Sequence, residues 1–438
     1  MSSAAPDDDD SGYPKRSYAW GVLAILVATA IVSYTDRQVL SLLVDPVRHD
    51  LGITDTQISL LLGTAFAVIY GIAGIPFGLL ADRTSRRNLI FFAVVVWSIG
   101  TVACGYSQSF GQLFAARIIV GLGESVLSPA AISLIGDYFP PSRRGMAVGC
   151  FLSGIAIGIG ASILIGGGVL HLVDVGAMAG TPLADLAPWR MVLLLIGAPG
   201  LVWAMVILLI REPARRTAQS LDTPQAGAPT RRAALSVVAP IYLVVAMASL
   251  VDNAVGAWAP SLLIRNFGQD PAQVGVRLGI LLTIAFGGGV LLGGWLSDLV
   301  GGHGHWMRKL GVCMVASLLI MLVSVALISS HMSVVMAAIP MYFALSGIVT
   351  ACGFSSILDA IPNSRRGFAM ALSFFLNVAV GAGLGPTSVA LAGAHIFGAT
   401  AGLGPAIAFV AGFGYLLAAA AIILAFTASN IAKRSARR

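Results

Sequence analysis

Long apolar runs separated by short polar loops make up most of this chain. A helix rises about 1.5 Å per residue, so about 20 apolar residues cross the hydrocarbon core of a membrane. None of the runs shows the short alternating pattern of a membrane barrel strand. The pattern predicts an all-α membrane protein with 12 transmembrane helices, at 18–44, 57–80, 88–107, 111–135, 145–172, 190–210, 236–264, 275–297, 310–330, 333–358, 368–394 and 405–428.

Composition agrees with this prediction and the placement of charge refines it. The 438 residues are 57% hydrophobic and only 10% charged, which excludes an ordinary soluble domain. The net charge of +7 does not indicate nucleic acid, because the basic residues gather in the tails and in alternate loops. The exceptions are Arg37, Arg48, Arg117, Arg190, Arg265 and Arg277. We therefore expect a multi-pass protein of a bacterial inner membrane, with both termini in the cytoplasm.

The chain repeats itself. A shift of 216 positions takes Asp36 to Asp252 and Asp82 to Asp298, and after a longer loop a shift of 222 takes Asp137 to Asp359. Such repeats predict two pseudo-symmetric six-helix bundles of like orientation. The expected division is a disordered tail at 1–16, bundles at 17–212 and 236–432, a cytoplasmic linker at 213–235 and a basic tail at 433–438.

Two motifs carry a family resemblance. The loop after the second span reads Gly78-Leu-Leu-Ala-Asp-Arg-Thr-Ser-Arg-Arg87, and the fourth span contains Arg117-Ile-Ile-Val-Gly-Leu-Gly123. With the repeat, they resemble the major facilitator superfamily over nearly the whole chain. Tyr34-Thr-Asp-Arg37 and the stretch Arg117–Ser125 are most similar to its spinster branch, with the organic anion/cation symporters close behind.

The resemblance implies a transport function. Spinster-like members are implied to be proton-coupled exporters of lysolipids or sphingosine-1-phosphate. We therefore expect a proton-coupled secondary transporter that moves an amphipathic organic anion by alternating access. A proton-linked symporter of small organic or sugar-acid anions, a multidrug exporter, and a transporter-like sensor that moves nothing remain open alternatives.

Charges inside the first and fourth spans are the leading site candidates. A charge at membrane depth costs at least ~2.5 kcal/mol, so Asp36 and Arg37 should face a cavity or a partner. Helix rise puts Asp36 and Arg117 at similar depths, and Glu124 lies two turns from Arg117 on the same face. We expect Asp36 and Glu124 to couple protons, and Arg37 and Arg117 to bind substrate or form ion pairs.

Each of these residues has a simpler interpretation. Asp36 and Arg117 would then form a permanent ion pair that only locks two helices. Glu124 would only hydrogen-bond the first span, and Arg37 would be an anchor at the outer surface. The second half keeps only Asp252, because Arg117 and Glu124 correspond to Ile339 and Ser346. Asp252 is either a substrate or ion-pair residue or a group at a helix end.

Charged loops on the expected cytoplasmic side form a second candidate site. Asp82 can pair with basic groups of its loop or cap a helix, and the neighbouring arginines can bind Asp137. The repeat supplies a matching set, so we expect a cytoplasmic gate that closes the inside; a role in membrane insertion alone is the alternative. Its residues are Gly78, Asp82, Arg83, Arg86, Arg87, Asp137, Arg144, Asp298, Asp359 and Arg366.

Other functional classes find little support. The 4 cysteines lie in apolar spans without metal-ligand spacing, and the 6 histidines lie near span ends. No nucleotide-binding loop of the Gly-Lys-Ser/Thr type occurs. We therefore expect no enzyme activity, no metal and no cofactor, with a proton gradient as the energy source. The expected partners are a small amphipathic or anionic substrate and the lipid bilayer, with no nucleic acid, and the protein is expected to be monomeric.

Overall fold

The computed structural model describes residues 13–181, 184–215, 231–300, 305–361, 366–398 and 402–435, apart from some side chains inside these ranges. Every regular element in these ranges is helical. The described chain contains 12 helices long and apolar enough to cross a membrane. The all-α fold with 12 spans is therefore confirmed.

The first six spans are built from the following elements: α1 (Arg16–Gln38), η2 (Val39–Ser41), α2 (Val44–Leu51), α3 (Asp55–Ser59), η3 (Leu60–Thr64), α4 (Ala65–Arg83), α5 (Arg86–Tyr106), α6 (Phe110–Glu124), α7 (Leu127–Tyr138), α8 (Pro141–Asp174) and α9 (Pro188–Ile207). Three spans are compound: α1 continues as the 3₁₀ turn η2, α3 and α4 are joined by the π-helical η3, and the fourth span is divided between α6 and α7.

The remaining spans are built from α10 (Arg231–Phe267), α11 (Pro271–Leu299), α12 (Trp306–Val325), η4 (Ala326–Ile328), α13 (Met332–Ala360), α14 (Arg366–Leu376), η6 (Asn377–Ala382), α15 (Gly383–Ala392), η7 (Gly393–Phe397) and α16 (Leu403–Ser435). The eleventh span is compound: it runs from α14 to η7, and both η6 and η7 are π-helical. α10 begins inside the segment that the sequence assigned to the linker.

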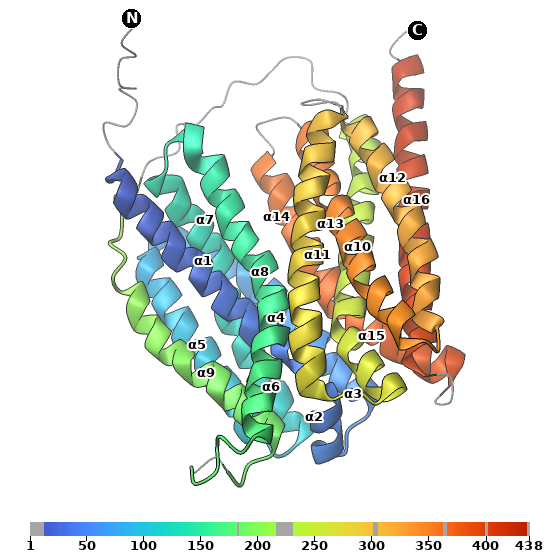
Figure 1. Cartoon of the computed structure of the whole chain (residues 1–438). Helices are drawn as coiled ribbons and strands as arrows, with labels where there is room; N and C mark the ends of the chain where they lie inside the picture. Colours follow the sequence, from blue (N-terminus) through green and yellow to red (C-terminus); the bar gives the residue numbers. More distant parts are fainter. Residues whose placement is uncertain are drawn as a thin grey trace, which may run out of the picture.

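The two halves stand side by side (Figure 1). The start of α1 and the end of α16 lie on the same side, at the top of the view, while α2 and α3 lie at the bottom. We call these the terminal side and the far side. Within each half, α1 packs on α8 and α5 on α9, and α10 packs on α16 and α12 on α13.

The halves meet through glycines on the far side. A Cβ atom added to Gly167 of α8 would lie 2.7 Å from the Cα atom of Gly275 in α11, and one added to Gly160 would overlap Thr283. The backbones of α8 and α11 therefore touch directly, as small residues permit in membrane helices. Nearby, the hydroxyl of Thr64 donates to the carbonyl of Gly383 at 2.9 Å, joining η3 to α15.

This glycine contact generates the first prediction. We expect Gly167→Ala to push α8 away from α11 and to raise by roughly threefold or more the population that is open on the far side, because overpacked atoms must move apart. The measurement is maleimide labelling of a cysteine placed at Ala272, which is buried beside Gly167. A Cβ at Gly168 meets nothing within 4 Å, so Gly168→Ala is the matched control. Equal labelling of the two variants would contradict the prediction.

Candidate functional site

Asp36 and Arg37 occupy the last turn of α1, deep inside the first half. Their exposed fractions are 1% and 9%. α1 ends at Gln38 and passes into a 3₁₀ turn, so this part of the span is a helix terminus within the membrane. The carbonyl groups of a last helical turn lack intrahelical donors and need other partners.

Arg117 supplies one such partner. Its Nη2 atom donates to the carbonyl of Arg37 at 3.3 Å, and its Nε atom donates to the carbonyl of Leu61 at 3.2 Å. Leu61 belongs to the π-helical η3, where the regular hydrogen-bond pattern is interrupted. Arg117 thus ties the first, second and fourth spans together.

The ion pair between Asp36 and Arg117 that helix depth predicted is not formed in the described structure. The guanidinium of Arg117 binds backbone carbonyls instead, because two helix irregularities place unpaired carbonyls closer to its donors. The alternative of a permanent Asp36–Arg117 lock is therefore not supported either. Both oxygens of Asp36 are buried without a hydrogen-bond partner.

Glu124 is a second buried carboxyl group. It is 2% exposed, and its Oε1 atom has no hydrogen-bond partner. It is the last residue of α6, and the span resumes as α7 at Leu127, with Pro129 in the first turn. A proline lacks the backbone N–H that a continuous helix would need at this position. An ionised carboxylate without hydrogen bonds is costly to bury, whereas the neutral acid costs much less.

Arg37 lies among aromatic rings. Its guanidinium carbon is 3.7 Å from the ring centre of Phe66, 5.3 Å from that of Tyr34 and 5.6 Å from that of Tyr70. Such contacts stabilise a desolvated cation by about 2 kcal/mol or more. The low exposure of Arg37 does not fit an anchor at the outer surface.

A cavity brings Arg37 and Glu124 together, and we call it the N-half pocket. Its volume is about 10 Å³, which is room for about one water molecule. Its polar lining consists of Ser33, Tyr34, Arg37, Tyr70, Glu124 and Ser128, and its apolar lining of Ala30, Leu127, Phe151 and Ile155. Asp36 is not part of this lining. Sequence reasoning missed Phe66 and Tyr70, because aromatic residues in an apolar span give no local signal of a site.

Asp252 lies in the middle of α10, away from either end of that helix. Its Oδ1 atom accepts a hydrogen bond from the hydroxyl of Tyr342 at 2.8 Å and another from the hydroxyl of Ser346. Both donors belong to α13. The interpretation of Asp252 as a group at a helix end is therefore wrong, because α10 continues for several turns beyond it.

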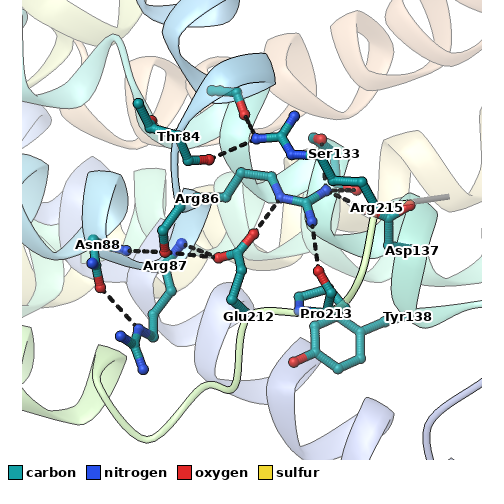
Figure 2. A network of polar contacts seen from close by, with 12 residues as sticks. Thr84, Arg86, Arg87, Asn88, Ser133, Asp137, Tyr138, Glu212, Pro213 and Arg215 are labelled. Atoms are coloured by element: carbon teal, nitrogen blue, oxygen red, sulfur yellow. Dashed lines mark hydrogen bonds and ion pairs between the residues drawn. The ribbon is translucent and has the colours of Figure 1, made fainter. Parts of the chain in front are cut away.

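On the terminal side, Arg86 is the centre of a polar network (Figure 2). Its side chain is 2% exposed, forms an ion pair with Asp137, and donates from Nε to Glu212 at 2.8 Å. Glu212 also accepts from the backbone N–H of Arg87 at 2.9 Å and from Ser85 at 3.0 Å. Sequence reasoning found Arg86 and Asp137 but missed Glu212, which follows the sixth span directly.

The second half has a similar but displaced pair. Lys309 Nζ lies 2.6 Å from Asp359 and donates to Ser355 at 2.8 Å. In the repeat, Lys309 corresponds to Arg87 and not to Arg86. The cationic partner of Asp359 is therefore one residue further along the chain than the partner of Asp137. Neither Arg308 nor an arginine after Asp359 provides the described pair. Both networks lie within single halves.

The other predicted gate residues are more dispersed. Arg144 donates to the carbonyl of Gly136 at 2.7 Å, the guanidinium of Arg87 donates to Asn88, and Gly78 has open space around it. Arg83 and Asp298 are exposed. The side chains of Asp82 and Arg366 lie outside the described part of the structure. The expected closure between the halves is therefore not formed by the gate residues that are described.

The described ion pairs that do join the halves are on the far side. Arg265, near the end of α10, lies 2.5 Å from Asp45 and makes two 2.9 Å contacts with Asp55. Arg48 adds a 3.3 Å contact to Asp55. We call these four residues the far-side clamp. Sequence reasoning missed it because its partners come from helices far apart in the chain.

Comparisons with known proteins identify the family. The Major Facilitator Superfamily model matches residues 26–386, and the chain belongs to this superfamily of transporters. It is a secondary transporter and not an enzyme. Solved structures of a bacterial homologue of the human lysosomal transporter spinster, inward-facing, share the fold at 23% identity. The occupied form gives a TM-score of 0.76 with 97% of this chain and 98% of that chain covered, and the unoccupied form gives 0.75 with 95% and 96%.

Relatives in sequence are named for several different functions. An MFS-type efflux pump of Mycolicibacterium smegmatis is 28% identical over 400 residues, which cover 89% of this chain and 87% of that protein. The protein spinster of Drosophila melanogaster is 26% identical over 64% of this chain and 46% of its own length. A D-galactonate transporter of Escherichia coli is 25% identical over 64% of this chain and 66% of its own length.

The environment of Glu212 generates a pH-dependent prediction. Burial alone would raise the pKa of Glu212, but hydrogen bonds from the Arg87 backbone and from Arg86 and Ser85 lower it below its usual value. A lowered pKa in the folded state stabilises the fold above the unfolded value of about 4.3, and this stabilisation is lost as the pH falls through the folded value. We expect Glu212→Gln to lower the thermal unfolding midpoint at pH 7, and the difference from wild type to shrink below about pH 4.3. A pH-independent difference in unfolding midpoint would contradict this.

The far-side clamp generates another prediction. Replacing Arg265 with Gln removes the contacts to both aspartates and, at about 0.7 kcal/mol for each partly exposed pair, should shift the conformational population roughly tenfold toward the state open on the far side. Maleimide labelling of a cysteine at Ala272 reports this opening. Arg277 is exposed on the same side and belongs to α11, so Arg277→Gln is the control. Unchanged labelling in the Arg265 variant would show that the clamp does not hold the halves together.

Proposed function

We propose that this chain is a proton-coupled secondary active transporter that moves an amphipathic organic anion by alternating access. The observation that carries the proposal is the pair of buried carboxyl groups, Asp36 and Glu124, beside two arginines inside the membrane. Buried ionisable groups in membrane spans are rare and mark proton or substrate pathways.

Proton coupling follows from the unsatisfied oxygens. Both oxygens of Asp36 and Oε1 of Glu124 lack hydrogen-bond partners, so a proton would relieve the cost of burying each carboxylate. A proton drives alternating access only if it binds the two conformations with different affinity. Asp36 adjoins the carbonyl of Arg37 that holds Arg117, so its charge acts on the contact that ties three spans together.

Arg37 is the proposed receptor for the anionic group. None of the described ion pairs includes its guanidinium, whose neighbours are the faces of aromatic rings. Ring stacking covers one face of the guanidinium and leaves the N–H donors at its edge for a carboxylate or phosphate. The apolar lining of the N-half pocket, including Phe151 and Ile155, suits a hydrocarbon segment next to that anionic group.

A second candidate substrate is a small sugar-acid anion. The hydroxyl groups of Ser33, Tyr70 and Ser128 line the same pocket as Arg37 and could hydrogen-bond the hydroxyls of a sugar. The D-galactonate transporter among the relatives favours this class, whereas the spinster relative favours the amphipathic class. The efflux pump leaves export of drug-like molecules as a third alternative.

The proposed orientation places both termini in the cytoplasm. The basic loops lie on the terminal side, in agreement with the positive-inside rule. With the far-side clamp and the α8–α11 glycine contact closed, the chain is then proposed to be in an inward-open state. A single chain supplies both halves of this pathway, which favours a monomer as the functional unit.

The proposed function predicts separate effects for the carboxyl groups and for Arg37. Asp36→Asn and Glu124→Gln should each abolish accumulation of substrate driven by a pH gradient, because the variant group no longer binds a proton. Arg37→Ala should weaken binding of anionic substrates about tenfold or more, since it removes a charged hydrogen-bond partner. The measurement is uptake into proteoliposomes with an imposed pH gradient, using a lysophospholipid and D-galactonate as alternative substrates.

Controls separate coupling from folding. Asp185→Asn removes an exposed carboxylate of the loop before α9 and should leave the pH-gradient response unchanged. Substrate exchange without a gradient should survive in the Asp36 and Glu124 variants. If both variants still accumulate substrate with the pH dependence of wild type, the two carboxyl groups do not couple protons. Transport of neither substrate by wild-type protein would refute both proposed substrate classes.

A further inference from the structure

A second cavity lies on the terminal side, between the start of α1 and the turn that joins α7 to α8 (Figure 1). We call it the rim pocket. Its volume is about 150 Å³, far more than the roughly 10–15 Å³ that one water molecule needs, so it has room for a group of the size of a phosphate. The proposed transport function uses none of the residues that line it.

The charged side chains of the rim pocket all have the same sign. Lys15, Arg16 and Arg143 line it, and none of its described lining residues is acidic. The described ion pairs include neither Lys15 nor Arg16. Three cations around one cavity repel one another, and an anion placed between them removes that repulsion. The lining therefore favours an anionic ligand.

Two helices begin at the rim pocket. α1 begins at Arg16 after Lys15, and α8 begins at Pro141 after Pro140. In the described structure, neither N-terminus has a side-chain hydrogen bond as a cap, and neither has an acidic residue in its first turn. The first amides of a helix lack intrahelical acceptors and carry a partial positive charge, which suits a phosphate. Two helix N-termini and three cationic side chains thus converge on one cavity.

The remaining lining suits a lipid better than a free anion. Trp20 and Phe139 line the rim pocket and meet edge to face, with ring centres 5.4 Å apart, and Tyr138 lines it as well. Tryptophan and tyrosine are typical of the layer where lipid headgroups meet the hydrocarbon core. Met146, one turn after Arg143 on α8, is 64% exposed and offers an apolar surface next to the charged group. Anionic and apolar surfaces of one ligand therefore both find a partner here.

We infer that the rim pocket binds the phosphate headgroup of an anionic membrane phospholipid, which stays at the surface of the first half and is not transported. The phosphate lies among Lys15, Arg16 and Arg143, while the acyl chains remain in the bilayer. Because α1 and α8 pack on each other, a headgroup held by the start of both helices stabilises the first half. The inference goes beyond the proposed function and does not depend on the transported substrate.

Three probes test the headgroup and the source of the phosphate. Phosphatidylglycerol and phosphatidylcholine with the same short acyl chains differ in net charge, and glycerol 3-phosphate carries a phosphate without acyl chains. Each is titrated into the full-length detergent-solubilised protein, and the thermal unfolding midpoint is measured. We expect phosphatidylglycerol to raise the midpoint of the wild-type protein at concentrations about tenfold or more below those at which either other probe does so.

Charge-removing variants test the three cations. Each basic residue near an anionic headgroup is worth about fivefold in affinity, so Arg143→Gln should raise the half-maximal phosphatidylglycerol concentration about fivefold and the double variant Lys15→Gln with Arg16→Gln about tenfold or more. Arg16→Lys keeps the charge and should retain most of the affinity. Arg308→Gln is the matched control, because Arg308 is an exposed arginine at the start of α12, and it should change the half-maximal concentration less than twofold. Midpoints measured without lipid show whether each variant is folded.

Four outcomes overturn the inference. Equal responses to phosphatidylglycerol and phosphatidylcholine would show contact with acyl chains alone. Equal affinity for glycerol 3-phosphate would make the pocket a site for a free anion. Equal losses in the Arg308 variant and in the double variant would assign the lipid effect to overall surface charge. A phosphatidylglycerol response that appears only after deletion of residues 1–10 would assign the pocket to the acidic segment Asp7–Asp10, which precedes it in the chain.

Discussion

The hydrocarbon core of a membrane offers no water, so every polar group placed there must find its partner within the protein. In this chain the partners at the candidate site come from interrupted helices. The carbonyls of Arg37 and Leu61 become available where the first span turns into a 3₁₀ segment and the second passes through a π segment, and Arg117 takes both. Glu124 marks a third interruption, in the fourth span. Irregular backbone and buried charge therefore occur together. The interrupted helices need hydrogen-bond donors for their carbonyls, and the buried charged side chain needs acceptors.

The two halves use their repeated framework for different chemistry. The first half holds two arginines and two carboxyl groups inside the membrane, while the second surrounds Asp252 with hydroxyls. Polar networks around Arg86 and Lys309 brace each half separately. The contacts between the halves are of another kind, glycine surfaces and partly exposed ion pairs, which are easier to break than a packed core. This division fits two rigid bundles that move relative to one another.

The sequence was sufficient for the fold because its strongest signals are regular. Spans of about 20 apolar residues and a repeat of 216 to 222 positions predicted the 12 helices, and the charged pair Arg86–Asp137 was within reach of motif reasoning. The site was only partly predictable. The depths of the two residues along their helices predicted that Arg117 lies near Asp36. They could not predict that the guanidinium of Arg117 would donate to backbone carbonyls instead. The far-side clamp joins helices from distant segments of the chain, which no local pattern encodes.

The glycine surface between α8 and α11 has a mechanical consequence. Helices usually interlock through side-chain ridges and grooves. To change the angle between two such helices, the ridges of one must leave the grooves of the other. Where Gly167 lies against Gly275, no such ridges exist, and the two backbones meet as smooth cylinders. The crossing can then act as a bearing that resists rotation only weakly. The contacts at the helix ends therefore decide which side of the molecule opens. The glycine crossing itself favours neither direction of rotation.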